Sequence, residues 1–210
     1  MRVFILCTGR SGSTAIINAC KHIKNYTSSH ESLTHSFGRD RFRYPENHIE
    51  ADNQLAWHLV LLNKLYDDDP IYVHLKRDKE MVAQSFLKRF YIPGSIIDSF
   101  CEGIRMTPSE KLSKEMRLKA CYDYIDTVNA NIEHFLAKKS KVITLNLETI
   151  RVDFIQFWNY LGAEGNLEKA LHEFDKKHNA TSQRRLNMAW RMRLIATREW
   201  RHIKSYFHSV

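Results

Sequence analysis

The first fourteen residues constrain this chain more than any other segment, because an apolar run leads through a glycine-containing loop into a helical pattern. The apolar run is residues 3–7, and the loop reads Thr8-Gly9-Arg10-Ser11-Gly12-Ser13-Thr14. A turn of this kind directs several backbone N–H groups and the positive end of the helix dipole at one point, where an anion binds. The segment therefore predicts a strand, an anion-binding loop and a helix. The simpler alternative is a plain strand-to-helix connection with a serine or threonine cap.

The loop departs from the nucleoside-triphosphate pattern G-x-x-x-x-G-K-[ST] at two fixed positions. Aligned on Gly12 and Thr14, the chain has Cys7 in place of the first glycine and Ser13 in place of the lysine. This argues against an ordinary ATP or GTP hydrolase. The loop keeps one cation, Arg10, which suits an oxyanion held without a dedicated set of metal ligands. Hydroxyl groups flank that cation at Thr8, Ser11, Ser13 and Thr14.

A second strand delivers another cation to its carboxyl end. Residues 71–75 are rich in β-forming side chains, follow Pro70 and lead into Lys76-Arg77-Asp78, after which residues 80–87 turn helical. Ser85 lies eight residues beyond Arg77, so the two side chains are candidates to converge on one phosphate. The spacing alone is common, but it gains weight in a chain that already has a phosphate loop.

These features resemble the sulfotransferases that use 3′-phosphoadenosine 5′-phosphosulfate (PAPS). The loop at residues 8–14 looks like their 5′-phosphosulfate loop, and Arg77 with Ser85 looks like their 3′-phosphate pair. The segment 146–150, which follows a strand at 141–145 and precedes aromatic residues and Gly162, is similar to a third conserved region of that family. The resemblance spans about residues 1–162. Lys79 departs from it, because many members have proline after the strand-end arginine.

The resemblance implies a transferase with a P-loop NTPase-like sulfotransferase fold, a three-layer α/β/α arrangement around a central parallel sheet. The alternation of strands and helices along the chain points to the same class. The implied reaction moves a sulfuryl group from PAPS to a hydroxyl or amine acceptor by in-line displacement. In that reading Arg10 stabilises charge at the transferred group. The nucleotide-binding residues are Gly9, Arg10, Ser11, Gly12, Ser13, Thr14, Arg77 and Ser85.

The catalytic base is expected shortly after the first helix. Members of the family place a glutamate there, and Glu31 matches that position; His30 is the competing candidate, since an imidazole titrates near neutrality. Other members use a histidine ahead of the strand that delivers the arginine. His48 and His58 lie in that part of the chain, without the surrounding family pattern.

Four further assignments concern the rest of the nucleotide and the acceptor. Arg184-Arg185 resembles a late basic loop that closes over the 3′-phosphate, although the glycine of that loop is missing; a basic helix start is the alternative. Trp57 or Trp190 is a candidate to stack on adenine. Residues 32–50 and 86–110 are expected to shape the pocket for an unknown hydroxyl-bearing acceptor.

Composition narrows the class of protein. The chain of 210 residues has no linker-like stretch, so we expect a single domain over residues 1–210. A formal charge of +8 implies an anionic partner, but the basic residues are dispersed and no nucleic-acid motif accompanies them. No membrane anchor or signal peptide is indicated, which favours a cytoplasmic location. The four cysteines occur singly and are expected to be reduced and buried, and the aspartates at 67–69 predict a turn rather than a metal site.

Two helices are predicted from apolar spacing and capping. Leucines at helical spacing predict a helix over residues 49–66. Thr107-Pro108-Ser109-Glu110 predicts a capping box that opens a long helix continuing to Phe135. A short strand is expected at residues 25–28.

Two other function classes remain open from the sequence. One is a kinase-like phosphotransferase on the same fold, which Ser13 at the lysine position argues against. The other is a catalytically silent nucleotide-binding protein that has lost its acceptor site. The sequence leaves the oligomeric state undetermined.

Overall fold

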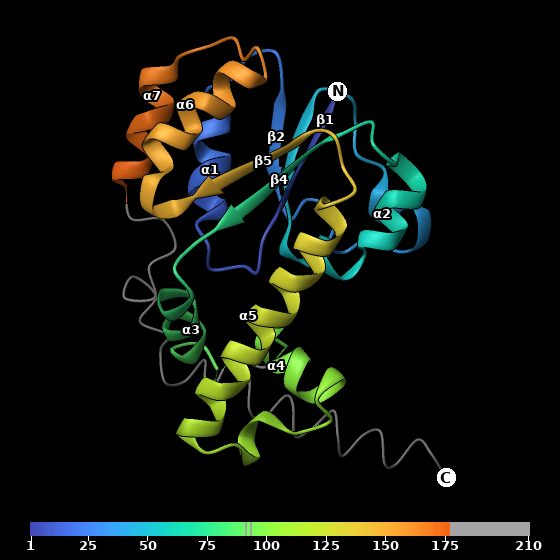
Figure 1. The fold of residues 1–210 in the computed structure, drawn as a ribbon, viewed down its shortest axis with the longest axis vertical. Coiled ribbons are helices and arrows are strands. Elements are labelled where there is room, and N and C mark those ends of the chain that lie inside the picture. The colour runs from blue at the N-terminus through green and yellow to red at the C-terminus, as the bar shows by residue number, and fades with distance from the viewer. Residues whose placement is uncertain (91, 93, 177–210) are drawn as a thin grey trace. The chain divides into compact units, whose positions relative to one another are not determined.

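The computed structural model describes residues 1–90, 92 and 94–176 (Figure 1). The chain divides into two compact units. Among the described residues, the sheet unit comprises residues 1–82 and 125–176, and the helical unit comprises residues 83–124. The two boundaries fall inside helices α3 (Lys79–Leu87) and α5 (Lys114–Leu136). The expectation of a single domain stays a prediction.

The sheet unit is built on five parallel strands in the order β2-β3-β1-β4-β5. Their bounds are β1 Arg2–Leu6, β2 Thr27–His30, β3 His48–Ala51, β4 Ile71–Lys76 and β5 Val142–Asn146. Val3 pairs with Ile49 on one side and with Ile71 on the other, so β1 is the central strand. The predicted α/β class with a parallel sheet is confirmed. Parallel strands present their carboxyl ends at one edge, and the loop after β1 lies in the middle of that edge.

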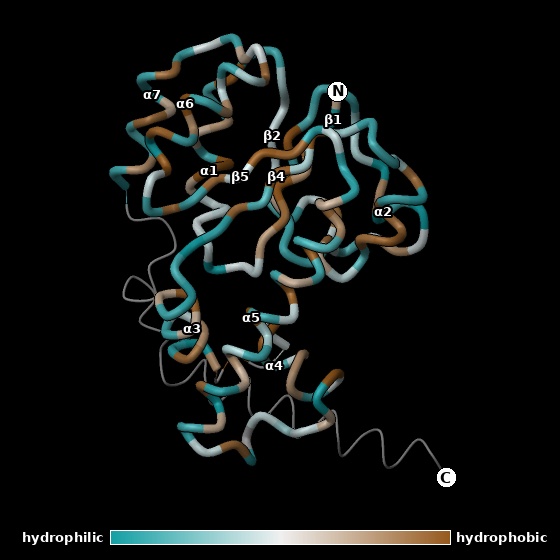
Figure 2. The backbone as a smooth tube through the Cα atoms, in the orientation of Figure 1, coloured by the Kyte–Doolittle hydropathy of each residue, from teal (hydrophilic) through white to brown (hydrophobic). Residues whose placement is uncertain are grey.

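Helices cover both faces of this sheet (Figure 1). On one face the helices α1 (Ser13–Cys20), α6 (Ile150–Tyr160) and α7 (Leu167–His172) close a core with inward-facing strand residues, among them Val3, Ile5, Val73 and Leu145. Figure 2 shows the hydrophobic stretches along β4 and β5. Burial of near-continuous apolar strands is typical of a parallel sheet with helices on both sides.

The opposite face packs through aromatic rings. Phe4 contacts Tyr66 of α2 (Leu59–Tyr66) with ring centroids 5.3 Å apart, and Tyr72 meets Phe135 of α5 edge-on at 5.0 Å. His74, which is buried on β4, lies 3.3 Å from the Asn129 side-chain oxygen of α5. Alternate residues of β1 and β4 therefore serve two different cores, as the period of a strand requires.

The helical unit contains the rest of α3, the short helix α4 (Ile96–Ser99) and the first half of α5. Its core includes Tyr124, whose ring is packed edge-on by Phe86 and Phe100 at 5.2 and 5.4 Å. Ser95 caps α4, and the buried Asp98 carboxylate accepts hydrogen bonds from the Gly94 N–H and the Ser109 hydroxyl.

Three element predictions need correction. The helix predicted over 49–66 is instead β3, a 3₁₀ turn at Asn53–Trp57 and α2, because the leucine spacing that suggested one helix belongs only to its second half. The predicted capping box does not open α5: Thr107 donates to the Arg105 carbonyl, and Ser113 caps the helix by accepting from the Met116 N–H at 3.2 Å. The short strand expected at residues 25–28 is β2, which runs two residues later, over Thr27–His30.

The described residues bear on two further expectations. All four cysteines are buried, and no disulfide joins them. The aspartates at 67–69 form a turn whose carboxylates accept from neighbouring side chains, for example Asp68 from the Ser140 hydroxyl. Within the described part of the chain, no helix combines the length and apolar character that a membrane crossing needs.

Candidate functional site

The loop between β1 and α1 has a backbone that few residue types adopt. Gly9, Arg10 and Gly12 all lie at positive φ, with values of 79°, 61° and 95°. The first turn of α1 closes through hydrogen bonds from the Ala15 and Ile16 N–H groups to the Gly12 carbonyl. This backbone is the strand, loop and helix that the sequence predicted. The initial N–H groups of a helix point out of its start, which suits an anion, and anion binding by this loop stays a prediction.

Both glycines are also required by close neighbours. A Cβ on Gly9 would lie 2.7 Å from the Asn53 side-chain nitrogen, and one on Gly12 would lie 2.6 Å from a methyl carbon of Leu147. Asn53 follows β3 and Leu147 follows β5, so the turns after two other strands pack against the loop. Glycine at these two positions therefore permits both the positive φ and the close packing of Asn53 and Leu147.

Hydroxyl groups reinforce the loop from inside. The Thr8 and Ser11 side-chain oxygens lie 3.0 Å apart and are both buried, and each also donates to the Gly9 carbonyl. Cys7, at the position of the first glycine in the triphosphate pattern, is fully buried, and burial raises the pKa of its thiol to about 12. Cys7 is therefore a neutral packing residue at physiological pH.

Arg77 reaches the loop from the neighbouring strand. It follows β4, and its Nη1 donates to the Arg10 carbonyl at 3.0 Å. The prediction that Arg10 and Arg77 share one sheet edge is confirmed. The Asp78 N–H next to Arg77 donates to the Glu148 carboxylate at 2.9 Å, which ties the start of α3 to the turn after β5. The segment 146–150 therefore supports both sides of the loop.

The other predicted 3′-phosphate residues stay predictions. Ser85 is half-buried on α3 within the helical unit, so its convergence with Arg77 stays a prediction. Arg184, Arg185 and Trp190 lie outside the described residues.

Both candidate bases lie beside the loop. His30 ends β2, and its Nε2 lies 2.8 Å from the Ser13 hydroxyl oxygen at the start of α1. Glu31 follows at φ 54° and donates its N–H to the Ala51 carbonyl of β3 at 3.0 Å. One Glu31 carboxylate oxygen lies 3.9 Å from His30 Nδ1. The imidazole thus stands between the loop hydroxyl and the carboxylate.

Partial burial raises the pKa of the Glu31 carboxyl group. Desolvation is the largest cause of its raised pKa, and the neighbouring carboxylates of Asp52 and Glu50 act in the same direction. His30 and Arg41 act against that shift. A carboxyl group with a raised pKa is a better proton acceptor once it is ionised, which suits a general base.

A buried polar network beside Glu31 was missed by the sequence reasoning. Asp52 is fully buried and forms an ion pair with Arg41, whose Nη1 donates to the Tyr44 hydroxyl at 2.7 Å. Glu50, also fully buried, accepts from the Ser32 N–H and lies 3.0 Å from His48 Nε2. Glu50 lies on β3 and Asp52 follows it. The sequence analysis predicted a helix for this segment, so it did not bring these two carboxylates together.

A sequence signal for β3 does exist. Pro45-Glu46-Asn47 breaks the chain just before this strand, and Asp52-Asn53 breaks it just after. The four residues between the two breaks alternate polar and apolar side chains, a strand pattern that the longer leucine series overrode.

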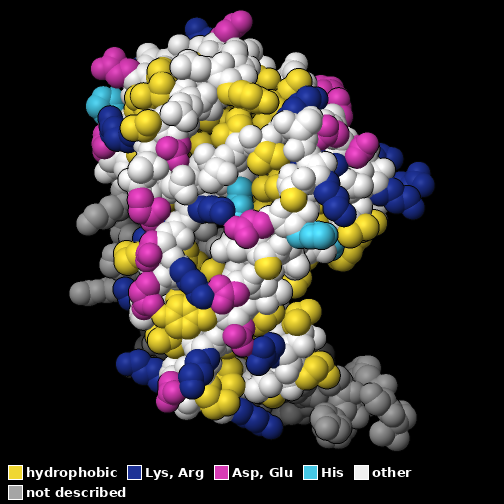
Figure 3. Space-filling model, in the orientation of Figure 1, with side chains coloured by type: hydrophobic (Ala, Val, Ile, Leu, Met, Phe, Trp, Pro, Cys, Tyr) yellow, Lys and Arg dark blue, Asp and Glu magenta, His cyan; other side chains and the backbone are white. Residues whose placement is uncertain are grey.

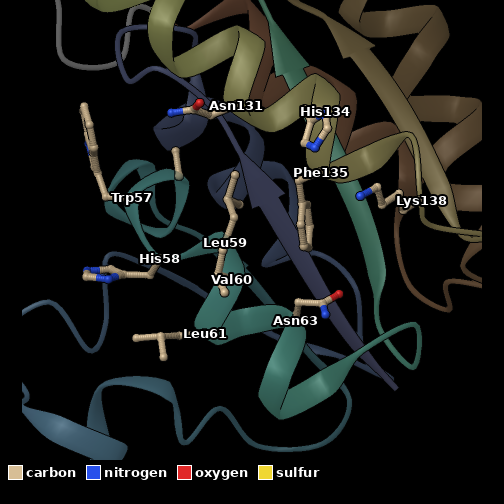
Figure 4. A pocket seen from close by; sticks show the side chains of 11 residues that line it. Trp57, His58, Leu59, Val60, Leu61, Asn63, Asn131, His134, Phe135 and Lys138 are labelled. Carbon is tan, nitrogen blue, oxygen red and sulfur yellow. The ribbon is translucent and has the colours of Figure 1, made fainter.

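A separate groove of about 530 Å³ lies between α2 with its preceding turn and the later turns of α5 (Figure 4). Trp57, Leu59 and Phe135 supply apolar lining, with His58 and Lys138 nearby. Trp57, one candidate for adenine stacking, lines this groove, and that role stays a prediction. On the face drawn in Figure 3, acidic and basic side chains are interspersed.

Comparison with known proteins identifies the fold and no more. No family model and no curated protein matches the chain. Among solved structures, a sulfotransferase domain from the curacin biosynthetic pathway is similar over 83% of this chain and 78% of that one, with a TM-score of 0.60 and 11% sequence identity. The chain therefore has a sulfotransferase-like α/β fold.

Proposed function

We propose that this protein is a PAPS-dependent sulfotransferase. The observation that carries the proposal is the contact of the Arg77 side chain with the backbone carbonyl of Arg10, in a loop that lacks the triphosphate lysine. Glu31 follows β2, which is the next strand but one from β1. An ATP-dependent phosphotransferase needs a phosphate-reaching lysine at the Ser13 position. A donor carrying phosphate at two places needs cations on more than one strand, which this sheet edge provides.

The loop and Arg77 are assigned to the donor. The backbone N–H groups of residues 9–14, that of Ser11 included, with the Ser13 and Thr14 hydroxyls would hold the 5′-phosphosulfate, and Arg77 with Ser85 the 3′-phosphate. The positive φ of Gly9, Arg10 and Gly12 shapes this loop, which supports the assignment. Arg10 is always charged, so we assign it stabilisation of the leaving phosphate rather than proton donation.

We assign Glu31 the role of the general base that removes the proton of the acceptor. The acceptor oxygen or nitrogen attacks sulfur, the bond between sulfur and the bridging phosphate oxygen breaks, and Glu31 takes the acceptor proton. The pair of electrons from the broken bond remains on the phosphate. Only a carboxylate performs this step, so activity rises with pH through the raised pKa of Glu31.

Calorimetry with the desulfated product tests donor binding without an acceptor. We expect 3′-phosphoadenosine 5′-phosphate to bind at least about tenfold more tightly than adenosine 5′-phosphate, because one charge-assisted contact contributes about 1.5–3 kcal/mol. Arg77→Met should reduce that ratio, and Arg43→Met, an exposed arginine paired with Asp40, should leave it unchanged. Equal affinity for the two nucleotides would refute the assignment. Preference for magnesium ATP would favour the kinase-like alternative.

An acceptor screen with labelled donor tests transfer. Glu31→Gln keeps the size of the side chain and removes the basic oxygen, so we expect turnover to fall by about 10²-fold or more with little change in nucleotide affinity. Normal turnover of this variant would remove Glu31 as the base and leave His30 as the candidate. Tight nucleotide binding with no transfer to any acceptor class would favour a silent nucleotide-binding protein.

A further inference from the structure

His30 stands between two groups to which the proposed function gives different tasks. Its Nε2 lies 2.8 Å from Ser13, which is assigned to the donor phosphate, and its Nδ1 lies 3.9 Å from a carboxylate oxygen of Glu31, which is assigned to the acceptor proton. The first distance is a hydrogen bond, and the second is a close electrostatic approach beyond hydrogen-bond length.

The single hydrogen of the Ser13 hydroxyl links the donor phosphate to His30. A serine hydroxyl has one hydrogen, so Ser13 can donate to His30 Nε2 or to a phosphate oxygen, but not to both. When the hydrogen turns toward a phosphate, a lone pair of the Ser13 oxygen faces Nε2 instead. In the neutral tautomer that carries its hydrogen on Nδ1, toward the Glu31 carboxylate, Nε2 also presents a lone pair. Two lone pairs at 2.8 Å repel each other, and a proton on Nε2 relieves that repulsion.

We propose that His30 couples donor binding to Glu31: as the donor phosphate takes the Ser13 hydrogen, His30 Nε2 takes up a proton from solvent, and the imidazolium pairs with the Glu31 carboxylate. The inference rests on the proposed function. Glu31 is a carboxylate before and after the donor binds, so the N–H bond at Nε2 is the only bond that forms and one proton is taken up from solvent. His30 is then a positioning residue rather than a catalytic one.

The charged groups near this pair come from several elements. Glu31 faces the imidazole from the end of the same strand, and the Glu50 and Asp52 carboxylates, on β3 and just after it, act on Glu31, opposed by Arg41. Arg10 is the cation of the loop itself. The helix α1 has no acidic residue in its first turn and no basic residue in its last turn. The buried Cys7 thiol stays neutral, and an arriving phosphate adds negative charge on the Ser13 side.

The experiment is titration calorimetry of the whole protein with 3′-phosphoadenosine 5′-phosphate in buffers of different ionisation enthalpy. The dependence of the observed enthalpy on the buffer reports the protons taken up per nucleotide bound. We expect uptake by the natural protein near neutral pH, loss of uptake in His30→Gln and Ser13→Ala, and retention in Ser13→Thr, which keeps the hydroxyl. His134→Gln, an exposed histidine on α5, is the matched control and should retain uptake.

The outcomes separate this inference from the proposed function. Nucleotide binding without proton uptake, or with equal uptake in His30→Gln, overturns the coupling and leaves donor binding intact. Failure of the natural protein to bind the nucleotide overturns the proposed function as well. If His30→Gln does not fold, ¹⁵N NMR of the natural protein decides: the His30 Nε2 resonance should change from an acceptor to a protonated nitrogen on nucleotide addition, and an unchanged resonance contradicts the coupling.

Discussion

At the scale of single residues, two glycines that both have positive φ differ in how closely other side chains pack against them. Gly12 lies at φ 95°, and an added Cβ would be 2.6 Å from Leu147, whereas Gly38 lies at φ 58° with no atom within 4 Å of its would-be Cβ. Gly38→Ala should lower the free energy of unfolding by about 1–2 kcal/mol from backbone strain alone. Gly12→Ala should cost about 1–3 kcal/mol more through overpacking and should weaken nucleotide binding, as measured by urea unfolding and calorimetry. Equal costs for both variants would show that Leu147 does not restrict the loop.

A buried histidine makes stability depend on pH. Burial is the main reason that the pKa of His74 falls from 6.5 to about 4, and the nearby Lys76 adds to the effect. The unfolded chain binds the proton more tightly, so the stabilisation is complete above about pH 6.5 and is lost as pH falls toward 4. Between about pH 7 and about pH 5 the expected loss is about 2 kcal/mol.

Replacing His74 with glutamine isolates that contribution. The amide keeps a donor for Asn129 and does not titrate. Urea unfolding at both pH values should show a smaller loss for His74→Gln than for the natural protein. Parallel losses in the two proteins would mean that His74 does not titrate on unfolding in this range.

Residue patterns predicted the loop well, since its chemistry is local. Gly9, Arg10 and Gly12 adopt left-handed backbone, and the carbonyl of Arg10 accepts from Arg77 as the shared edge requires. His30 and Glu31 also reach the loop. The contact between Ser13 and His30 was not predictable from sequence, because it depends on how far β2 extends before the chain turns.

At the scale of elements, β3 shows where sequence patterns fail. Its four residues give too short a pattern to compete with the leucine series that follows. All four residues are buried, although His48 and Glu50 are polar. The polar side chains would lead one to expect an exposed segment, whereas the segment is in the interior. Only the pairing with β1 and β2 on either side makes this segment a strand. The missed network around Glu50 and Asp52 follows directly from that missed element.

The ion pair of Arg41 and Asp52 joins two short turns that flank β3. Arg41 belongs to the turn Gly38–Phe42, and Asp52 caps the turn Asn53–Trp57 by accepting from the Gln54 N–H at 2.8 Å. Asp52→Ala leaves a buried guanidinium without its carboxylate, which should cost about 3–5 kcal/mol in the free energy of unfolding. Because Asn53 packs on Gly9, nucleotide affinity should fall too.

A matched control comes from the same turn. Asp40 pairs with Arg43 at 3.2 Å, but both side chains are largely exposed. Asp40→Ala should therefore change the unfolding free energy by no more than about 1 kcal/mol. Chemical denaturation of the two variants makes the comparison, and similar costs would show that the buried pair contributes no more than a surface one.

At the scale of the whole molecule, composition predicted an anionic partner without locating it. The chain carries 32 basic and 24 acidic residues, and Figure 3 shows both kinds interspersed on the face it draws. A diffuse positive excess attracts small anions from all directions, whereas under the proposed function Arg10 and Arg77 determine where the nucleotide binds. The first contribution is screened by salt, and the second is less so because it acts at contact distance.

Ionic strength should separate these two contributions to nucleotide binding. Raising salt from about 0.05 M to about 0.5 M should weaken the affinity for 3′-phosphoadenosine 5′-phosphate several-fold, because the Debye length shrinks from about 14 Å to about 4 Å. Adenosine, which has no phosphate, is the control and should bind with little salt dependence. Stopped-flow binding should place most of the change in the association rate. A dissociation rate that carries the whole change would mean that contact charges at the loop, rather than the net charge of +8, dominate attraction.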